Sequence, residues 1–116
     1  MDIETYRNYC LQKKGVSESF PFDNKTLVFK VEGKIFALTD IDNFTFINLK
    51  CNPEKAIELR EQFMGIMPGY HMSKKHWNSV YLEADVNDKL LVELIDNSYL
   101  LVVKSLPKIV QQKLLI

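Results

Sequence analysis

The sequence predicts an α+β domain of two layers, in which a curved, mainly antiparallel sheet of five strands is covered by helices. Segments with helical periodicity separate two groups of strand-like segments, in the order α-β-β-β-α-β-β-α. Most of the strands are joined by hairpin-length connections, which favours antiparallel pairing. The 116 residues, 47% hydrophobic and 26% charged, are typical of a globular chain with one domain over residues 1–116.

The first helix is predicted over residues 2–14, because apolar side chains recur at the three-to-four spacing that places them on one face: Ile3, Tyr6 and Cys10. Acidic residues lie in its first turn and lysines in its last, which suits the helix dipole. Gly15 is able to adopt the left-handed conformation that ends a helix. Residues 16–23 are predicted to form a connecting loop.

Three strands are predicted next, over residues 26–31, 34–39 and 44–50. The first two are rich in β-branched and aromatic side chains, and Glu32-Gly33 between them is a hairpin signal. A polar turn precedes the third strand. Apolar and polar residues alternate in the first strand, which indicates one buried face and one solvated face.

A second helix is predicted over residues 53–63. Asn52 supplies a capping side chain and Pro53 occupies the first helical position, both of which are typical of a helix start. Four residues of this helix have the spacing that places them on one side: Ala56, Leu59, Arg60 and Phe63. Gly65 ends it.

Two more strands, over residues 68–73 and 77–83, are predicted on either side of a lysine-rich turn. The last helix begins after Asp85 or Asn87, each of which is able to cap it. Its apolar stripe has helical spacing. Pro107 ends or bends this helix and leaves a short, partly helical tail.

The charges sum to zero, since 15 Lys and Arg face 15 Asp and Glu, but they are unevenly distributed along the chain. Residues 62–82 contain no acid, and residues 97–116 contain three lysines and no acid. The intervening residues 83–96 hold five acids and one lysine. Net neutrality argues against a protein that coats nucleic acid through bulk charge, whereas local anion binding stays compatible with the sequence.

The most unusual segment is PGYHMSKKHWN, residues 68–78, which holds both histidines and the single tryptophan of the chain. A turn that carries Lys74 and Lys75 beside aromatic side chains is able to neutralise phosphates and stack on a base. The alternative is a solvated hairpin tip with Trp77 in the core. From the residues alone, both interpretations stay open.

Metal binding and nucleophilic catalysis are less favoured. His71, His76 and Cys51 are potential zinc ligands, but they have no recognisable ligand spacing. Cys10 and Cys51 form no CxxC pair, and we expect two buried thiols in a reducing, cytoplasmic compartment. The glycines form no phosphate-binding loop. We therefore expect no metal, no cofactor, no leader segment and no membrane span.

The chain resembles the MmcQ/YjbR family of small bacterial proteins from about Tyr9 to Lys108. The resemblance rests on three blocks. The first runs from FPFD (20–23) to VFKV (28–31), followed by GKIFAL (33–38), and the second is LKCNPEKA (49–56). The third is PGYHMSKKHWNSV (68–80), continued by ELIDNSY (93–99) and LPK (106–108), and its PGYHMSKKHWN segment is the most specific part. Asn52 stands where the family frequently has Asp, which preserves the capping role.

This resemblance implies the curved sheet shared by secretion chaperones and frataxin-like proteins, and DNA binding through a double-wing arrangement. It places the nucleic-acid-binding residues at eight positions: Lys50, Tyr70, His71, Lys74, Lys75, His76, Trp77 and Asn78. Met72 also belongs to the family signature. The leading hypothesis is a non-enzymatic DNA-binding protein.

Two other functions remain as alternatives. The first is a chaperone-like interaction module that binds a partner chain or self-associates through the apolar C-terminal segment, Ile109-Val110 and 114–116. The second is an enzyme for a small anion, with His71, His76 and Trp77 lining its pocket.

Overall fold

Ten helices and strands follow one another along residues 1–115, the part of the chain that this computed structural model describes. The helices are α1 (Ile3–Leu11), α2 (Pro53–Gln62), α3 (Asp88–Lys104) and α4 (Lys108–Leu114). The strands are β1 (Val16–Ser19), β2 (Thr26–Val31), β3 (Lys34–Asp40), β4 (Phe46–Lys50), β5 (Ile66–Pro68) and β6 (Trp77–Tyr81).

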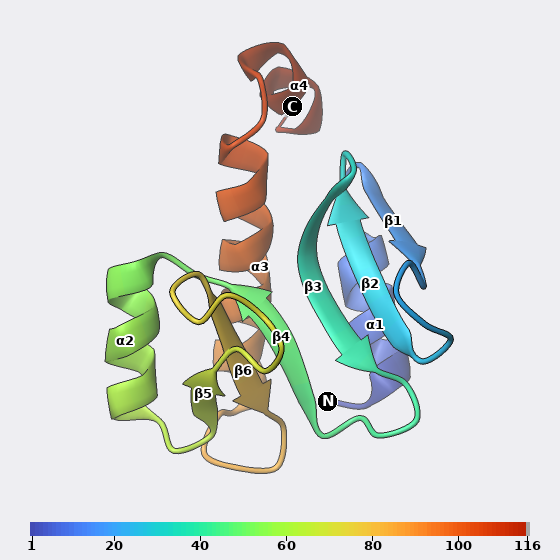
Figure 1. Cartoon of the computed structure of the whole chain (residues 1–116). Helices are drawn as coiled ribbons and strands as arrows, with labels where there is room; N and C mark the ends of the chain where they lie inside the picture. Colours follow the sequence, from blue (N-terminus) through green and yellow to red (C-terminus); the bar gives the residue numbers. More distant parts are fainter. Residues whose placement is uncertain (116) are drawn as a thin grey trace.

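The strands form one antiparallel sheet in the order β1-β2-β3-β4-β6-β5. Helices α1 and α3 cover one face of this sheet, and α2 flanks β5 and β6 at one edge (Figure 1). The predicted α+β class is confirmed, with six strands among the described residues instead of five. No helix within residues 1–115 is long and apolar enough to cross a membrane.

The additional strand is β1, in the region that the sequence predicts to be a loop. Its four residues, Val-Ser-Glu-Ser, alternate between half-buried and exposed positions. It pairs only with β2, at the edge of the sheet. A polar edge strand of this kind has little hydrophobic contrast between its faces, so sequence periodicity misses it.

The strand predicted over residues 68–73 is wrong: strand β5 lies earlier, over Ile66–Pro68, because the backbone turns at the next residues. A Cβ atom on Gly69 would lie 2.7 Å from the Cβ of Trp77, so only glycine fits this close approach. His71 has a left-handed backbone, with φ of 57°. Residues 69–76 therefore form a loop between β5 and β6, which we call the 69–76 loop.

The predicted helix starts are confirmed by their capping contacts. The Asn52 side chain accepts a hydrogen bond of 3.0 Å from the Glu54 N–H at the start of α2. The Asn87 side chain accepts one of 2.8 Å from the Leu90 N–H at the start of α3. These contacts satisfy N–H groups that have no partner within the helix.

Buried side chains lie on both faces of the sheet. The main core is on the helix-covered face and includes Tyr6, Phe29, Ile47 and Ile95, all fully buried. A second, smaller cluster lies on the opposite face, which we call the outer face: it contains Val28, Leu38 and Trp77, with Ile35 and Met72 packed against them. The outer-face cluster exists because the 69–76 loop, which carries Met72, covers this part of the sheet.

Ser98 of α3 connects β3 and β4 just beyond their last paired residues. Its fully buried hydroxyl accepts a 2.9 Å hydrogen bond from the Lys50 N–H and donates a 2.5 Å bond to the Phe36 carbonyl. The two strands pair directly only from Ala37 to Thr39 on the β3 side. The Ser98 hydroxyl thus replaces a strand–strand hydrogen bond and anchors α3 to the sheet.

We expect Ser98→Ala to lower the free energy of unfolding by about 2 kcal/mol, since it leaves a buried N–H and a buried carbonyl without partners. Ser105→Ala is the matched control. The Ser105 residue is exposed, and its hydroxyl bonds only the nearby Val102 carbonyl, at 2.6 Å. Urea unfolding should show a change within about 0.5 kcal/mol for the control. Equal changes in the two variants would contradict the bridging role of Ser98.

Candidate functional site

The 69–76 loop runs across the outer face of the sheet, in front of β6 and β4 (Figure 1). It is fixed to β6 at its base, where the Gly69 N–H donates a 2.9 Å hydrogen bond to the Trp77 carbonyl. Within the loop, the Trp77 N–H donates a 2.9 Å bond to the Ser73 carbonyl. Two further groups of contacts hold the loop on the sheet and on α2.

A closed ring of three hydrogen bonds holds the backbone of Tyr70. The Tyr70 N–H donates to the Ser79 hydroxyl at 2.9 Å, and that hydroxyl donates to Asn48 Oδ1 at 2.5 Å. Asn48 Nδ2 then donates to the Tyr70 carbonyl at 3.1 Å. Asn48 and Ser79 are buried, with 4% and 1% exposure, so these contacts are shielded from water. The ring fixes the start of the loop against β4 and β6.

Arg60 of α2 fixes the other end of the loop. Its Nε donates to Asn78 Oδ1 at 2.7 Å, and its Nη2 donates to the carbonyls of Lys74 and Trp77, the latter at 3.2 Å. Asn78 Nδ2 donates in turn to the Ala56 carbonyl in α2 at 3.4 Å. The planar guanidinium suits several acceptors at once. One side chain of α2 thereby positions the lysine-bearing part of the loop.

The structure separates the sequence-predicted site residues into two groups. Trp77 and Asn78 are buried, with 8% and 2% exposure. Trp77 lies under the loop on the outer face, whereas Asn78 faces α2 on the other side of the sheet and acts on the loop through Arg60. The others reach the surface: Tyr70, His71, Lys74, Lys75 and His76 are exposed, and Lys50 is half-buried. The sequence leaves open whether the Trp77 side chain is buried. In the structure it is buried, as part of the outer-face cluster.

Lys50 lies on the same face as the loop lysines. It pairs with Trp77 across β4 and β6, so both side chains stand on the outer face. The next residue, Cys51, donates its N–H to the His76 carbonyl at 2.8 Å. Lys74 Nζ donates to the Gly69 carbonyl at 3.0 Å and is held across the loop.

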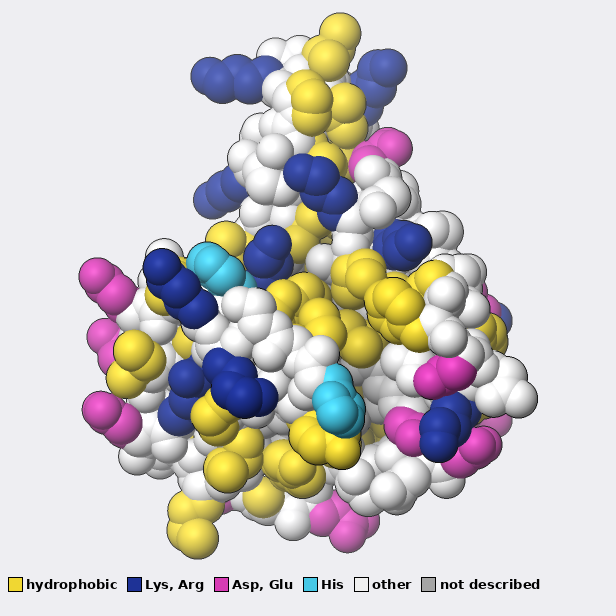
Figure 2. Space-filling model, viewed as in Figure 1, with side chains coloured by type: hydrophobic (Ala, Val, Ile, Leu, Met, Phe, Trp, Pro, Cys, Tyr) yellow, Lys and Arg dark blue, Asp and Glu magenta, His cyan; other side chains and the backbone are white. Residues whose placement is uncertain are grey.

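The charges on this face are segregated in space as well as in sequence. Figure 2 shows lysine and arginine side chains gathered over the 69–76 loop and continuing along α3 toward α4. Acidic side chains instead gather at the outer edge of α2 and at the lower right of the view. The loop therefore presents a locally basic surface on a chain of zero net charge.

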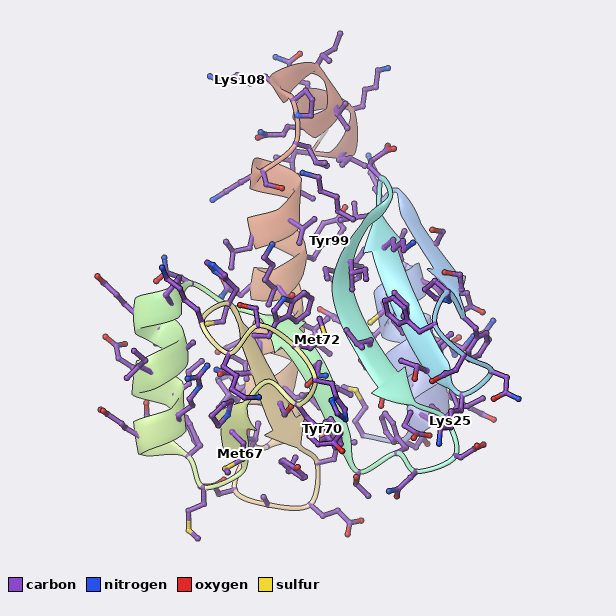
Figure 3. The ribbon with its side chains drawn as sticks, viewed as in Figure 1. Lys25, Met67, Tyr70, Met72, Tyr99 and Lys108 are labelled. Carbon is purple, nitrogen blue, oxygen red and sulfur yellow. The ribbon has the colours of Figure 1, made fainter. Side chains whose placement is uncertain are left out.

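A pocket of about 390 Å³ lies on the side of Tyr70 that faces away from Lys74 and Lys75, between the loop and the chain that leads into β2. Its lining includes Tyr70, His71, Phe46 and Lys25. The Tyr70 ring contacts Phe46 edge-on at 5.8 Å and His71 at 4.0 Å between ring centroids. In Figure 3, Tyr70 lies on the loop and Lys25 lies across from it, at the start of β2. This volume falls within the range of about 300–1,000 Å³ that is usual for small-ligand pockets.

The other chemistries raised by the sequence find little support in the geometry. Within residues 1–115 no three potential ligands among His, Cys, Asp and Glu gather to hold a metal ion. Burial raises the pKa of the Cys10 thiol to about 12, although the charge of Lys13 opposes this shift. Burial also raises the pKa of the Cys51 thiol. Both thiols are buried and protonated at neutral pH, which disfavours nucleophilic reactivity.

The C-terminal segment is partly exposed. Ile109 and Leu115 of this segment have 66% and 54% exposure, whereas Leu114 is buried. Ile116, the last residue of the predicted self-association segment, lies outside the described residues.

Three residues that shape the site were not among those predicted from the sequence: Arg60, Asn48 and Ser79. Two of them, Arg60 and Asn48, carry a signal in the sequence. Arg60 is a cation on the apolar side of a predicted helix, next to Leu59. Asn48 is an amide in the middle of an otherwise apolar strand segment. A polar side chain that is wholly or partly buried needs partners: Asn48 finds one in the Tyr70 carbonyl of the loop, and Arg60 finds one in Asn78 of β6.

Comparisons with known proteins give a consistent result. The YjbR family model matches residues 11–101. YbdF of Escherichia coli O157:H7 is 42% identical over 106 residues, covering 90% of this chain and 87% of YbdF. YjbR of Escherichia coli K12 is 36% identical over 109 residues, covering 93% and 92% of the two chains.

Two solved structures are similar to this one. The crystal structure of protein DR2400 from Deinococcus radiodurans matches with a TM-score of 0.89 and 41% identity, covering 97% of this chain and 86% of that one. A crystal structure of a protein from Pseudomonas syringae matches with a TM-score of 0.73 and 28% identity, covering 87% and 98% of the two chains.

Proposed function

The chain belongs to the YjbR family, and we propose that it is a non-enzymatic DNA-binding module that contacts phosphates with the basic surface of the 69–76 loop. The observation that carries this proposal is the anchoring of the loop. Arg60 and the buried pair Asn48 and Ser79 hold a segment without acids on the outer face of the sheet.

Three lysines supply the proposed phosphate contacts: Lys50, Lys74 and Lys75. They lie on an exposed loop and its neighbouring strand, outside the pocket that Tyr70 lines, so they suit a polyanion that crosses the surface. His71 and His76 are exposed beside them and are able to donate hydrogen bonds to phosphate or base oxygens. Trp77 and Asn78 act indirectly, by supporting the loop.

Binding through three lysines should be modest and depend steeply on salt. Three neutralised phosphates correspond to a slope of roughly −2.7 in a plot of log affinity against log salt concentration. Raising NaCl from ~50 to ~200 mM should therefore weaken binding about 40-fold.

The test is a fluorescence anisotropy titration of a labelled DNA duplex with the double variant Lys74→Glu, Lys75→Glu. We expect at least about a tenfold loss of affinity at low salt, with the slope falling toward about −0.9 because one phosphate contact would remain. Both lysines are exposed, and the substitution removes one side-chain contact, from Lys74 Nζ to the Gly69 carbonyl, so the melting temperature of the variant should fall by only a few degrees.

The control is Lys108→Glu, Lys113→Glu, which makes the same change in net charge on α4. Its exposed lysines lie away from the loop, and we expect a smaller loss of affinity with little change in slope. Equal losses in the two double variants would show that bulk charge governs binding. Absence of binding by the parent protein at low salt would refute the proposed function.

A further inference from the structure

The two sides of Tyr70 differ in charge. Lys50 and Lys74 of the proposed phosphate surface lie toward β6 and α2, whereas the pocket on the other side is lined by two carboxylates, Asp23 and Asp40, and by one lysine, Lys25. Each carboxylate accepts backbone N–H groups through one oxygen: Asp23 from Lys25 and Thr26, and Asp40 from Asp42 and Asn43. These contacts hold both acids in place as fixed acceptors at the pocket.

Aromatic rings form the opposite wall of the pocket. Tyr70 is 56% exposed, and its ring contacts His71 and Phe46. Phe46 also contacts Tyr81, with 5.1 Å between centroids. The left-handed backbone of His71, which costs about 1–3 kcal/mol in a residue other than glycine, sets its imidazole against the Tyr70 ring. The ring of hydrogen bonds at Asn48 and Ser79 maintains this arrangement.

We infer that this pocket receives an unpaired nucleobase, so that the preferred DNA ligand is single-stranded; this inference rests on the proposed function. Every base has a planar face able to stack on an exposed aromatic ring. Adenine, guanine and cytosine also carry amino groups that are able to donate hydrogen bonds to the fixed carboxylates. The base would enter beside Tyr70 while the backbone phosphates lie along the lysines.

The distribution of charge disfavours the reverse orientation. A phosphate in the pocket would face the carboxylates of Asp23 and Asp40 against the single ammonium of Lys25, a net repulsion that a neutral base does not meet. A paired duplex keeps its bases stacked inside the helix and so cannot place one in the pocket without the cost of unpairing it. Duplex DNA is therefore left with the lysine contacts alone.

The experiment compares a labelled single-stranded DNA with the duplex of the same sequence, for the parent protein, Tyr70→Ala and Tyr70→Phe. We expect the parent to bind the single strand at least about fivefold more tightly than the duplex, which corresponds to one stacked base. Tyr70→Ala should lose about 5- to 150-fold in affinity for the single strand and little for the duplex. Tyr70→Phe, which keeps the ring, should bind like the parent.

The outcomes separate this inference from the proposed function. Equal affinity for both DNA forms, unchanged by Tyr70→Ala, would overturn the nucleobase pocket and leave phosphate binding by the loop intact. Tighter binding of the duplex would overturn the inference as well. Failure of both DNA forms to bind at low salt would refute the proposed function and the inference with it.

Discussion

Replacing Trp77 with alanine is expected to lower the free energy of unfolding by about 3–5 kcal/mol, the usual cost of truncating a buried aromatic side chain. Trp77 is 8% exposed and packs with Val28 and Leu38 on the outer face, where Met72 of the loop covers it. The variant loses the platform on which the loop rests, so we also expect weaker DNA binding. Urea unfolding followed by circular dichroism measures the first effect.

The control for this prediction is Tyr81→Ala at the other end of β6. Tyr81 is 36% exposed, and we expect its truncation to cost less than half as much as that of Trp77. Trp77→Phe should recover most of the stability, because it keeps a large aromatic ring in the cluster. A loss below about 1 kcal/mol in Trp77→Ala would contradict the role of Trp77 as the support of the loop.

Arg60→Ala is expected to lower the free energy of unfolding by about 3 kcal/mol. The substitution leaves the buried Asn78 Oδ1 without its charged donor and releases the Lys74 carbonyl, and hydrogen bonds to charged groups contribute about 1.5–3 kcal/mol each. The lysine-bearing end of the loop then keeps its own backbone contacts, the Lys74 to Gly69 contact and the bond from the Cys51 N–H to the His76 carbonyl. We expect DNA affinity to fall together with stability. Arg60 is half-buried beneath the loop and is not one of the proposed phosphate contacts, so this loss of affinity would be indirect.

Arg7→Ala provides the matched control, since it makes the same chemical change at an exposed ion pair. Arg7 contacts Glu18 at 2.7 Å on the surface, and such pairs contribute about 0–1 kcal/mol. Arg60→Lys should rescue little, because an ammonium group does not reproduce the planar arrangement of donors. If Arg60→Ala and Arg7→Ala cost the same in urea unfolding, Arg60 does not hold the loop.

The order of elements and the family were predictable from the sequence because both depend on local patterns. Helix caps at Asn52 and Asn87, hairpin turns and the PGYHMSKKHWN block are read from neighbouring residues, and the structure and the comparisons confirm the fold class and the family resemblance. Strand β1 was missed because an edge strand with polar residues has weak periodicity.

The arrangement of the site was less predictable, because it depends on contacts between residues distant in sequence. Adjacent positions in the block have opposite roles: His76 is exposed and Trp77 is buried. Only the pairing of β6 with β4, together with Arg60 from α2, decides which side of the block faces water. The pocket likewise depends on the 69–76 loop meeting the start of β2, 45 residues or so earlier in the chain.

The 69–76 loop and its neighbour Lys50 are the proposed DNA-binding surface. Its most direct test is an NMR titration of the ¹⁵N-labelled protein with single-stranded DNA at low salt, followed through backbone amide shifts. We expect the perturbed amides to map to residues 69–76, to Lys50 and to the pocket residues around Lys25 where the base enters, with α1 and α4 unaffected. Perturbations centred on α4 or on β1, with the 69–76 loop unchanged, would contradict it.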